Sequence, residues 1–349
     1  MQGNIFPLFP RTRYQGSKYK IVDWIIDGTK SLEFNTILDA FGGTGVVGYN
    51  YKLQGKNVIY NDLLKFNSII GKALIENQGI LLEEKEVNKL LKKSVRGHNN
   101  FIQNVYKNIF FLDYENAWLD DMVYKISNIQ NPYKRAIAWF AVIQSCIIKR
   151  PYNLFHRANL TTRTAMVNRT FGNKTTWDKP FDYYFKKFVM EANMAVFDSG
   201  GKTLVLNQDA TSIDVDLYKF DAVYIDTPYI SNKGIGTDYL DFYGFLEGLV
   251  NYNNWDSQIL YNYKHKPLKG KGNKSWTGKN EIYYSFDKLF KHYKDKKMII
   301  SYRNDGIPAI DELIDMLKSY KKNITKIYGK DYKYVLSKKQ SKEMLIIAQ

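Results

Sequence analysis

The run that most constrains the fold is NTILDAFGGTGVVGYNYKLQGKNVIYND, residues 35–62. Residues 35–45 have the pattern of a buried strand that ends in a glycine-rich loop. Residues 46–55 then suit a helix that stops at Gly55, and residues 57–62 suit a second strand. A strand–helix–strand order predicts a parallel sheet, with a ligand crevice at the carboxyl ends of its strands.

Further strands are expected beyond a long helical stretch. Residues 66–150 carry apolar side chains at helical spacing, whereas residues 151–182 are polar and weakly periodic. Residues 202–210, 221–226 and 297–302 predict more sheet strands, and the tail suits closing antiparallel strands. We therefore expect one α/β sheet that is interrupted by a mostly helical insertion.

The charge balance favours a polyanionic partner. The 349 residues include 51 Lys and Arg against 35 Asp and Glu, which gives a formal net charge of +16. Nucleic acid is the commonest partner for such a chain. The alternative is a lysine-rich surface that is merely solvated.

The numbers and positions of cysteine and histidine indicate which cellular compartment to expect and whether a metal site is present. The single cysteine, Cys146, excludes an internal disulfide, and the four histidines are too scattered to suggest a metal site. The N-terminus lacks a signal-peptide pattern, and the longest apolar run, residues 136–148, is too short to span a bilayer. We expect a cytoplasmic protein with no metal and no membrane association.

The glycine loop admits two rival ligands. Gly43, Gly45 and Gly48 fit G-x-G-x-x-G after a strand, and Asp62 ends the next strand where an acid can bind a ribose. One candidate ligand for this loop is a nicotinamide dinucleotide. However, Asp39 before the loop would repel a pyrophosphate and would attract the ammonium and sulfonium groups of S-adenosylmethionine. The acid therefore favours the sulfonium ligand, with a plain tight turn as the bland alternative.

A second acidic motif ends a later strand. In VYIDTPYI, Asp226, Thr227, Pro228 and Tyr229 follow three β-prone residues. Methylation of an exocyclic amine requires acceptors for the amino hydrogens, and a base that leaves the duplex requires an aromatic partner. The Asp226 carboxylate, the Thr227 carbonyl and the Tyr229 ring supply these functions, while Pro228 stiffens the turn. A structural strand-end turn is the alternative.

Taken together, the motifs resemble those of the N6-adenine DNA methyltransferases of the D12 class, which include the Dam-like enzymes. Thr227 departs from the proline usual in the family's Asp-Pro-Pro-Tyr motif, although the backbone carbonyl that matters is retained. The matching segments are RYQGSKYKIVDWI (13–25), DAFGGTG (39–45), the pair Asn61-Asp62, the Asp226 motif and ISYRNDGIPAIDEL (300–313).

The resemblance implies a Rossmann-like methyltransferase domain and roles for its residues. It places the catalytic domain in 1–75 and 200–349 and an inserted helical target-recognition domain in 76–199. Asp39 would hold the cofactor's amino group, Asp62 the ribose, and Asp209 the cofactor adenine, unless Asp209 is only a helix cap. Catalysis would rest on Asp226 and Tyr229. The other expected cofactor residues are Tyr14, Gly16 and Lys18 at the carboxylate end and Phe41, Gly43 and Gly45 in the pocket wall.

The basic, polar segment of residues 150–182 is expected to recognise the DNA sequence. Arginine and asparagine recognise guanine and adenine in the major groove, and lysine holds phosphates. A solvated loop with salt-bridged arginines is the alternative. The candidate DNA-binding residues are Arg150, Arg157, Arg163, Arg169, Asn173 and Lys174.

The expected function is S-adenosylmethionine-dependent methylation of adenine N6 in a specific double-stranded DNA sequence, by base flipping, with S-adenosylhomocysteine as product. The chain would be the modification half of a restriction–modification system, beside a separate endonuclease, or an orphan methylase, and a monomer or weak dimer. An NAD-dependent oxidoreductase and a catalytically degenerate DNA-binding module are the alternatives.

Overall fold

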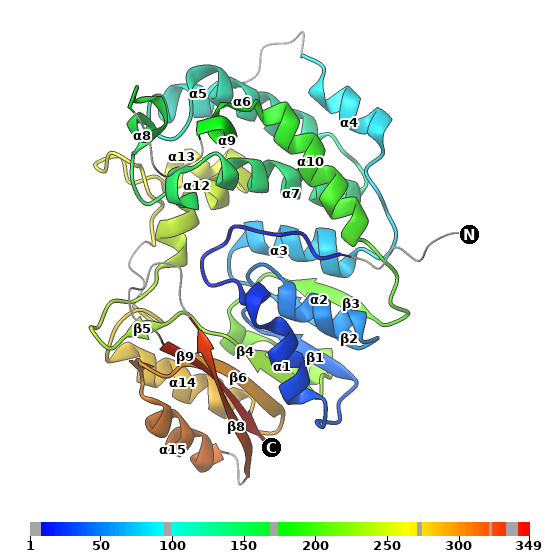
Figure 1. Ribbon diagram of the computed structural model, residues 1–349, viewed down its shortest axis with the longest axis vertical. Coiled ribbons are helices and arrows are strands. Elements are labelled where there is room, and N and C mark those ends of the chain that lie inside the picture. The colour runs from blue at the N-terminus through cyan, green and yellow to red at the C-terminus, as the bar shows by residue number, and fades with distance from the viewer. Residues whose placement is uncertain (1–7, 94–98, 168–173, 271–273, 321–322, 333–340) are drawn as a thin grey trace. The chain divides into compact units, whose positions relative to one another are not determined.

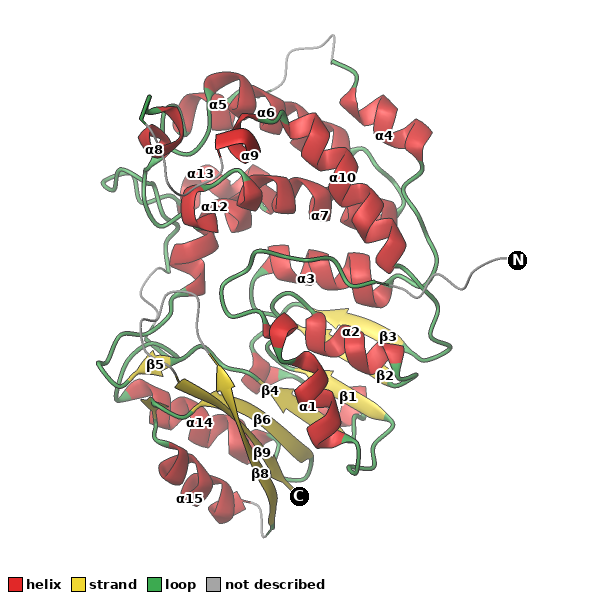
Figure 2. Cartoon of the chain, in the orientation of Figure 1, coloured by secondary structure: helices red, strands yellow, loops and turns green. Residues whose placement is uncertain are grey.

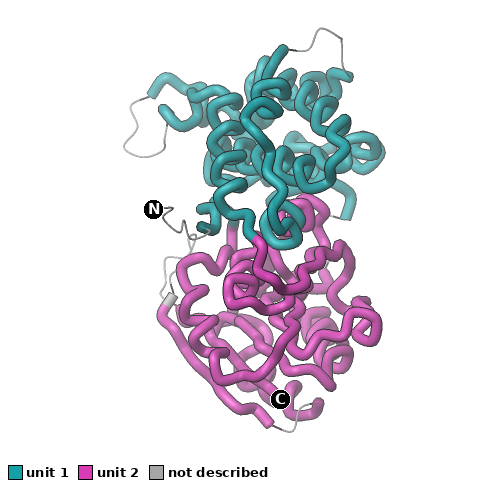
Figure 3. Tube along the Cα trace, turned by 90° about the vertical axis from the view of Figure 1, so that its right-hand side faces the viewer, with its two compact units in different colours: residues 1–14, 72–197, 240–271 teal, residues 15–71, 198–239, 272–349 magenta. Residues whose placement is uncertain are grey.

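The structure is a computed structural model that describes residues 8–93, 99–167, 174–270, 274–320, 323–332 and 341–349. The chain divides into two compact units, which we call the sheet unit and the helical unit and describe separately (Figure 3). The sheet unit comprises residues 15–71, 198–239 and 272–349, and the helical unit comprises residues 1–14, 72–197 and 240–271.

The sheet unit contains a seven-stranded sheet of order β3-β2-β1-β4-β6-β9-β8 (Figures 1 and 2). The first five strands in this order are parallel, and β9 runs antiparallel to both β6 and β8. The predicted α/β class and the antiparallel closing strands are therefore confirmed. The strands are β1 (Thr36–Asp39), β2 (Asn57–Asn61), β3 (Thr203–Leu206), β4 (Ala222–Ile225), β6 (Lys297–Arg303), β8 (Ile324–Tyr332) and β9 (Ser341–Ala348), and a separate pair is β5 (Ile230–Ser231) with β7 (Gly306–Ile307).

Helices cover both faces of this sheet, which explains why its central strands are apolar without alternation. α2 packs on β1 and β2, whereas α14 and α15 cover the opposite face. The sheet-unit helices are α1 (Val22–Thr29), α2 (Val46–Leu53), α3 (Lys65–Gly71), α11 (Val215–Tyr218), α14 (Glu281–His292) and α15 (Ile310–Tyr320), with short 3-10 turns at Lys18–Lys20 and Ala210–Ser212.

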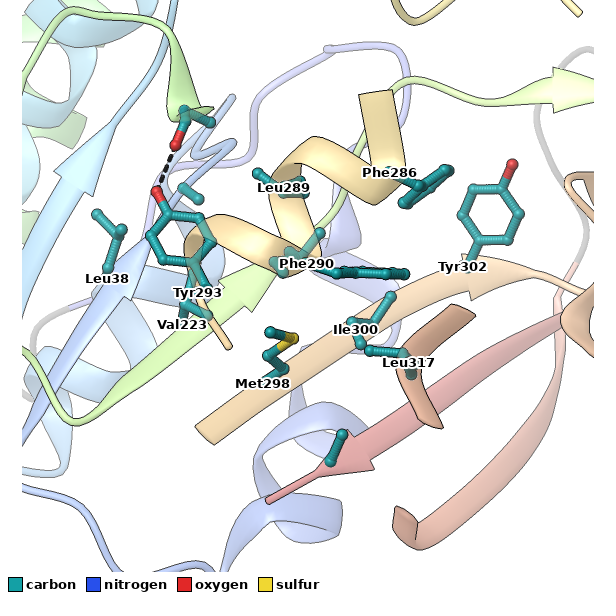
Figure 4. Close-up of a cluster of buried hydrophobic side chains, with 14 of the residues drawn as sticks. Leu38, Val223, Phe286, Leu289, Phe290, Tyr293, Met298, Ile300, Tyr302 and Leu317 are labelled. Carbon is teal, nitrogen blue, oxygen red and sulfur yellow. Dashed lines mark hydrogen bonds between the residues drawn. The ribbon is translucent and has the colours of Figure 1, made fainter. Parts of the chain in front are cut away.

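The core beneath α14 is a continuous apolar cluster (Figure 4). Leu38 of β1, Val223 of β4 and Met298 of β6 are fully buried there. Phe286 and Phe290 of α14 pack onto them, so this face alone buries several large side chains, each stabilising the fold by about 1.5–3 kcal/mol. This packing fixes the strands whose ends carry the acidic motifs.

The described part of the helical unit contains helices and loops (Figure 2). In α7, Pro132 occupies the first turn, and the Asn131 side chain accepts hydrogen bonds from the next backbone N–H groups. The unit's helices are α4 (Glu84–Leu91), α5 (Phe101–Val105), α6 (Asp113–Ser127), α7 (Pro132–Ile148), α8 (Leu160–Thr164), α9 (Lys174–Asp178), α10 (Phe181–Ala195), α12 (Tyr239–Val250, from Leu240 on) and α13 (Trp255–Gln258), with short turns at Lys72–Glu76, Pro151–Asn153 and Tyr252–Asn254.

The extents of the two units differ from the predicted domains mainly at residues 1–14 and 240–271, which the sequence assigns to the catalytic domain. These residues belong to the helical unit. For residues 240–271 the cause is an aromatic cluster: Phe245 of α12 and Trp255 of α13 contact Tyr106, and Phe245 also contacts Phe110 and Phe155. Contacts between segments so distant in sequence leave no local signal.

Candidate active site

The acidic motifs lie at the point where the strand order reverses. From β1 the chain proceeds outward to β2 and β3, whereas β4, on the other side of β1, is followed by β6. Asp39 is the last residue of β1 and lies in register with Tyr224 of β4, and Asp226 directly follows β4. Ligands of parallel α/β sheets bind at the carboxyl ends of strands at such a switch point.

The glycine loop between β1 and α2 requires three of its glycines. Gly43 and Gly45 adopt φ values of 52° and 80°, which residues with a Cβ rarely adopt. At Gly42 a Cβ would overlap the ring of Tyr60, whose hydroxyl donates to the Gly43 carbonyl at 2.7 Å. The loop is therefore a tight turn that packs against the Tyr60 ring.

Asp39 is a buried carboxylate with one unsatisfied oxygen. Its Oδ2 accepts a hydrogen bond from the Gly48 N–H at 3.1 Å, whereas Oδ1 is buried and accepts none from the described residues. Burial, only partly offset by that N–H, raises the pKa of Asp39 to about 8, and the nearby Asp226 adds to the shift. A buried acid of this kind would be stabilised by a cationic donor.

Asp62, after β2, is held by two backbone groups. Its Oδ2 accepts the Gly43 N–H at 2.9 Å and its Oδ1 accepts the Leu64 N–H at 2.8 Å. Burial raises the pKa of Asp62 to about 6, although the two N–H donors oppose the shift. The carboxylate is thereby oriented beside the glycine loop, and its remaining lone pairs can accept hydroxyl donors.

Asp226 belongs to a buried cluster that also contains Lys18, Tyr229 and Glu343, which we call the strand-end cluster. Asp226 Oδ1 accepts the Tyr229 hydroxyl at 2.6 Å and pairs with Lys18 Nζ at 2.8 Å. Lys18 Nζ lies 3.2 Å from Glu343 Oε1 and also donates to the Tyr229 hydroxyl. Every hydrogen bond and ion pair that Asp226 makes with the described residues uses Oδ1, so Oδ2 can accept a substrate hydrogen.

The charges in this cluster shift two pKa values. Burial raises the pKa of Asp226; Lys18 opposes the shift and Glu343 adds to it. Burial alone would lower the pKa of Lys18, but the carboxylates of Asp226 and Glu343 outweigh it and raise that pKa. Lys18 is therefore charged at neutral pH, one cation between two acids.

Thr227, which replaces the family's proline, is buried. Its Oγ1 has no hydrogen-bond partner among the described residues, and Pro228 beside it is partly exposed. The Tyr229 ring is also buried and meets Tyr302 edge-on at 5.4 Å. The Tyr229 hydroxyl contacts Lys18 and Asp226, and Lys18 Nζ lies 4.8 Å from the centre of the Tyr229 ring.

The other predicted cofactor residues fall in both units. Tyr14 belongs to the helical unit, where it stacks on Tyr243. Gly16 has φ 83° and Phe41 meets Trp276 edge-on at 5.3 Å, both within the sheet unit. Asp209 caps a short 3-10 turn and accepts the Thr211 N–H at 2.7 Å, which is the alternative that the sequence left open.

Two of the predicted DNA-reading arginines are buried, and this corrects their interpretation. Arg150 donates to the carbonyl oxygens of Phe110, Leu154 and Arg157. Arg163 forms a two-pronged ion pair with Glu115 at 2.8–2.9 Å. Both guanidinium groups are used inside the helical unit, so neither is placed to contact a base.

The remaining predicted DNA-binding residues have different placements. Arg157 and Lys174 are exposed. Lys174 pairs with Asp178 at 2.6 Å on the surface of α9, a contact that screening makes weak. Arg169 and Asn173 lie outside the described residues.

Glu343, a fully buried member of the strand-end cluster, is not among the site residues predicted from the sequence. Its signal was present, because a lone acid stands among the apolar residues of the run EMLIIA. An apolar strand seldom buries a carboxylate without a partner, so this residue could have been singled out.

Neither a metal centre nor a membrane span is found in the part of the chain that the structure describes. It contains no group of three or more His, Cys, Asp or Glu side chains that could hold a metal ion. Among the same residues, no helix is long and apolar enough to cross a bilayer.

Comparisons with known proteins agree with this geometry. The chain is 26% identical over 343 residues to the type II methyltransferase M2.HphI of Haemophilus parahaemolyticus, covering 97% of this chain and 96% of the relative. It is 26% identical to modification methylase StsI of Streptococcus sanguinis and 24% identical to type II methyltransferase M.FokI of Planomicrobium okeanokoites. The chain spans about half the length of these two relatives, 46% and 50%.

The family assignment follows from a broader match. The model of the D12 class N6 adenine-specific DNA methyltransferases matches residues 14–246, which is more than half of the chain. The match includes the glycine loop, Asp62 and the whole Asp226 motif. The chain belongs to the D12 class N6 adenine-specific DNA methyltransferase family.

Proposed function

We propose that this adenine-specific DNA methyltransferase uses S-adenosylmethionine to methylate N6 of adenine in one short double-stranded DNA sequence, after the base has left the duplex. The observation that carries the proposal is the placement of Asp39 and Asp226 at the ends of adjacent strands β1 and β4. One acid is available to a cationic cofactor and the other to an amine substrate.

The residues of the glycine loop fit the cofactor. Asp39 Oδ1 is a buried acceptor that an ammonium group would satisfy, and its raised pKa indicates that a nearby cation would be favourable. Asp62 would accept ribose hydroxyls, and Gly43 and Gly45 allow a ligand to approach the backbone. S-adenosylmethionine, when bound, supplies an electrophilic methyl group.

Asp226 would orient and activate the target amine. Its Oδ1 is held by Lys18 and Tyr229, so Oδ2 can accept one N6 hydrogen while the Thr227 carbonyl accepts the other. These contacts draw the nitrogen lone pair towards the methyl donor. After transfer the nitrogen is cationic and acidic, so water or Asp226 takes its proton. The Tyr229 ring is buried, so it would have to become accessible before it could stack on a base.

We further propose that the helical unit contributes to target recognition through exposed basic residues such as Arg157 and Lys174. The names of the relatives favour a role in restriction–modification, with any endonuclease carried by another chain. A monomer or weak dimer suffices for methylation of one strand at a time. The family match gives no support to the oxidoreductase alternative.

The proposal is tested by modification-sensitive long-read sequencing of DNA from cells that express the chain, with Asp226→Ala as control. We expect N6-methyladenine in one short motif and its loss in the control. Absence of the modified base in both samples would favour the catalytically degenerate alternative, and its presence in both would overturn the role of Asp226.

A further inference from the structure

Glu343 is a buried acid on a strand that is otherwise built for the core. It lies on β9 in register with Arg303 of β6, and its side chain is fully buried. Its Oε1 accepts the Ser301 hydroxyl at 2.6 Å and lies 3.1 Å from the Tyr229 hydroxyl, whose one proton it shares with Asp226 Oδ1. The same oxygen lies 3.2 Å from Lys18 Nζ. One carboxylate oxygen therefore meets two groups that also hold Asp226.

We infer that Glu343 is a positioning residue for methyl transfer, which holds Lys18 and Tyr229 against Asp226 Oδ1. The inference rests on the proposed function, since it concerns the same reaction. With Oδ1 held from two sides, the carboxylate plane of Asp226 cannot rotate freely. Its other oxygen, Oδ2, then faces the substrate in one orientation.

The charge balance explains why an acid is needed at this position. A buried carboxylate costs several kcal/mol to desolvate, and an apolar residue on β9 would avoid that cost. Lys18 alone would fully neutralise Asp226, whereas a second carboxylate shares the lysine charge. Asp226 thereby remains an electron-rich acceptor while its position is still fixed.

The inference is tested with Glu343→Gln, which keeps an acceptor oxygen of nearly the same shape but removes the charge. The matched control is Glu312→Gln, because Glu312 in the same unit also accepts a tyrosine hydroxyl, that of Tyr283 at 2.9 Å, outside the cluster. Measurements are single-turnover methyl transfer to DNA carrying the target motif, the Kd for S-adenosylmethionine, and the pH dependence of the rate.

We expect Glu343→Gln to slow transfer by about 10- to 100-fold through misplacement of Asp226, with cofactor Kd little changed. Because the Glu343 charge raises the pKa of Asp226, the acidic limb of the rate profile should move to lower pH. A merely structural role would lower the stability of Glu343→Gln but leave the transfer rate of the folded variant unchanged. Glu312→Gln should behave as the wild type.

If Glu343→Gln folds and shows the wild-type rate and pH profile, the inference is wrong. If it fails to fold, Ser301→Ala decides, since it removes only the hydroxyl that fixes Glu343. That variant should lower the rate several-fold without changing cofactor Kd, and an unchanged rate would overturn the inference. An inactive Asp226→Ala enzyme alongside either result leaves the proposed function intact, whereas an active one refutes it.

Discussion

The two units each bury an ion cluster, and the two clusters differ in which charge is in excess. In the sheet unit the strand-end cluster places Lys18 between Asp226 and Glu343. The acids outnumber the cation, and Asp226 keeps an oxygen that no described residue uses. Such a group remains available to a ligand.

The cluster in the helical unit has the opposite balance. Glu115 pairs with Lys149 at 2.8 Å and with Arg163 through both carboxylate oxygens. The two cations also donate to the carbonyl oxygens of Trp177 and Lys179. Burial would raise the pKa of Glu115, but Arg163 and Lys149 outweigh it and lower that pKa. This cluster holds together segments distant in sequence, which is a structural role.

Burial and ion pairing alone therefore do not distinguish a ligand-binding cluster from a cluster that only stabilises the fold. What distinguishes them is the position at a strand end and the excess of acceptors over donors.

Asp226→Asn should lower the rate of methyl transfer by at least ~1,000-fold, about 4 kcal/mol in the barrier, because the amide is a poorer acceptor for the amine hydrogens. Single-turnover assays with the target duplex measure the rate. The cofactor Kd from calorimetry should change little. A rate within tenfold of the wild type would contradict the assigned role.

Glu115→Gln should instead lower the free energy of unfolding by about 3 kcal/mol, since it leaves Lys149 and Arg163 short of a buried partner. Denaturant titration measures this. Glu83→Gln, which removes the charge from an exposed pair with Lys85, is the control and should change it far less, because solvent and salt screen exposed pairs. A stable Glu115→Gln protein with impaired transfer would reverse our assignment of the two clusters.

Asp39→Asn should raise the Kd for S-adenosylmethionine by about 10- to 100-fold, the worth of a charge-assisted hydrogen bond. Titration calorimetry gives the value. The transfer rate at saturating cofactor should fall far less than for Asp226→Asn. An unchanged Kd would remove Asp39 from the cofactor site.

The pH dependence follows from the same residue. The pKa of Asp39 is raised to about 8, so its carboxyl is largely protonated at pH 6.5 and ionised at pH 9. The affinity for S-adenosylmethionine should therefore increase from pH 6.5 to pH 9. In Asp39→Asn, the part of this increase that comes from ionisation of Asp39 should be absent. Because the folded-state pKa lies above the ordinary 3.8, the native state of the cofactor-free enzyme binds more protons than the unfolded chain. The contribution of Asp39 to the free energy of unfolding is therefore fully present below pH 3.8 and is lost as the pH rises from there through about 8.

Arg157→Ala should have the smallest effect. An exposed arginine that contacts a phosphate contributes about one unit to the slope of log affinity against log salt, so the slope should decrease by roughly 1. Fluorescence anisotropy of labelled duplexes at several salt concentrations measures it. Relaxed preference for one base pair would instead identify Arg157 as a base reader, and no change would exclude it from the interface.

The sequence predicted the parts of the fold that depend on local patterns. The strand–helix–strand run that ends at Asp62 was correct because buried parallel strands and positive-φ glycines have strong local signatures. The Asp226 motif was placed correctly at a strand end for the same reason.

The parts that depend on tertiary contacts were not predictable in this way. Arg150 and Arg163 lie in a segment whose composition is typical of DNA-binding segments. Their guanidinium groups instead donate to a carbonyl oxygen and a carboxylate inside the helical unit. Lys18 lies in the strand-end cluster beside Glu343, which is more than 300 residues further along the chain. No local pattern specifies which distant carboxylate a buried cation will meet.

The most direct test of the account is mass spectrometry of nucleosides from target DNA after a single turnover with purified wild type, Asp226→Asn and Glu115→Gln enzymes. The assay is run below the unfolding temperature of every variant. The account predicts N6-methyldeoxyadenosine from the wild type and, at near-normal rate, from Glu115→Gln, with almost none from Asp226→Asn. Comparable product from Asp226→Asn would contradict the claim that the strand-end cluster is the catalytic centre.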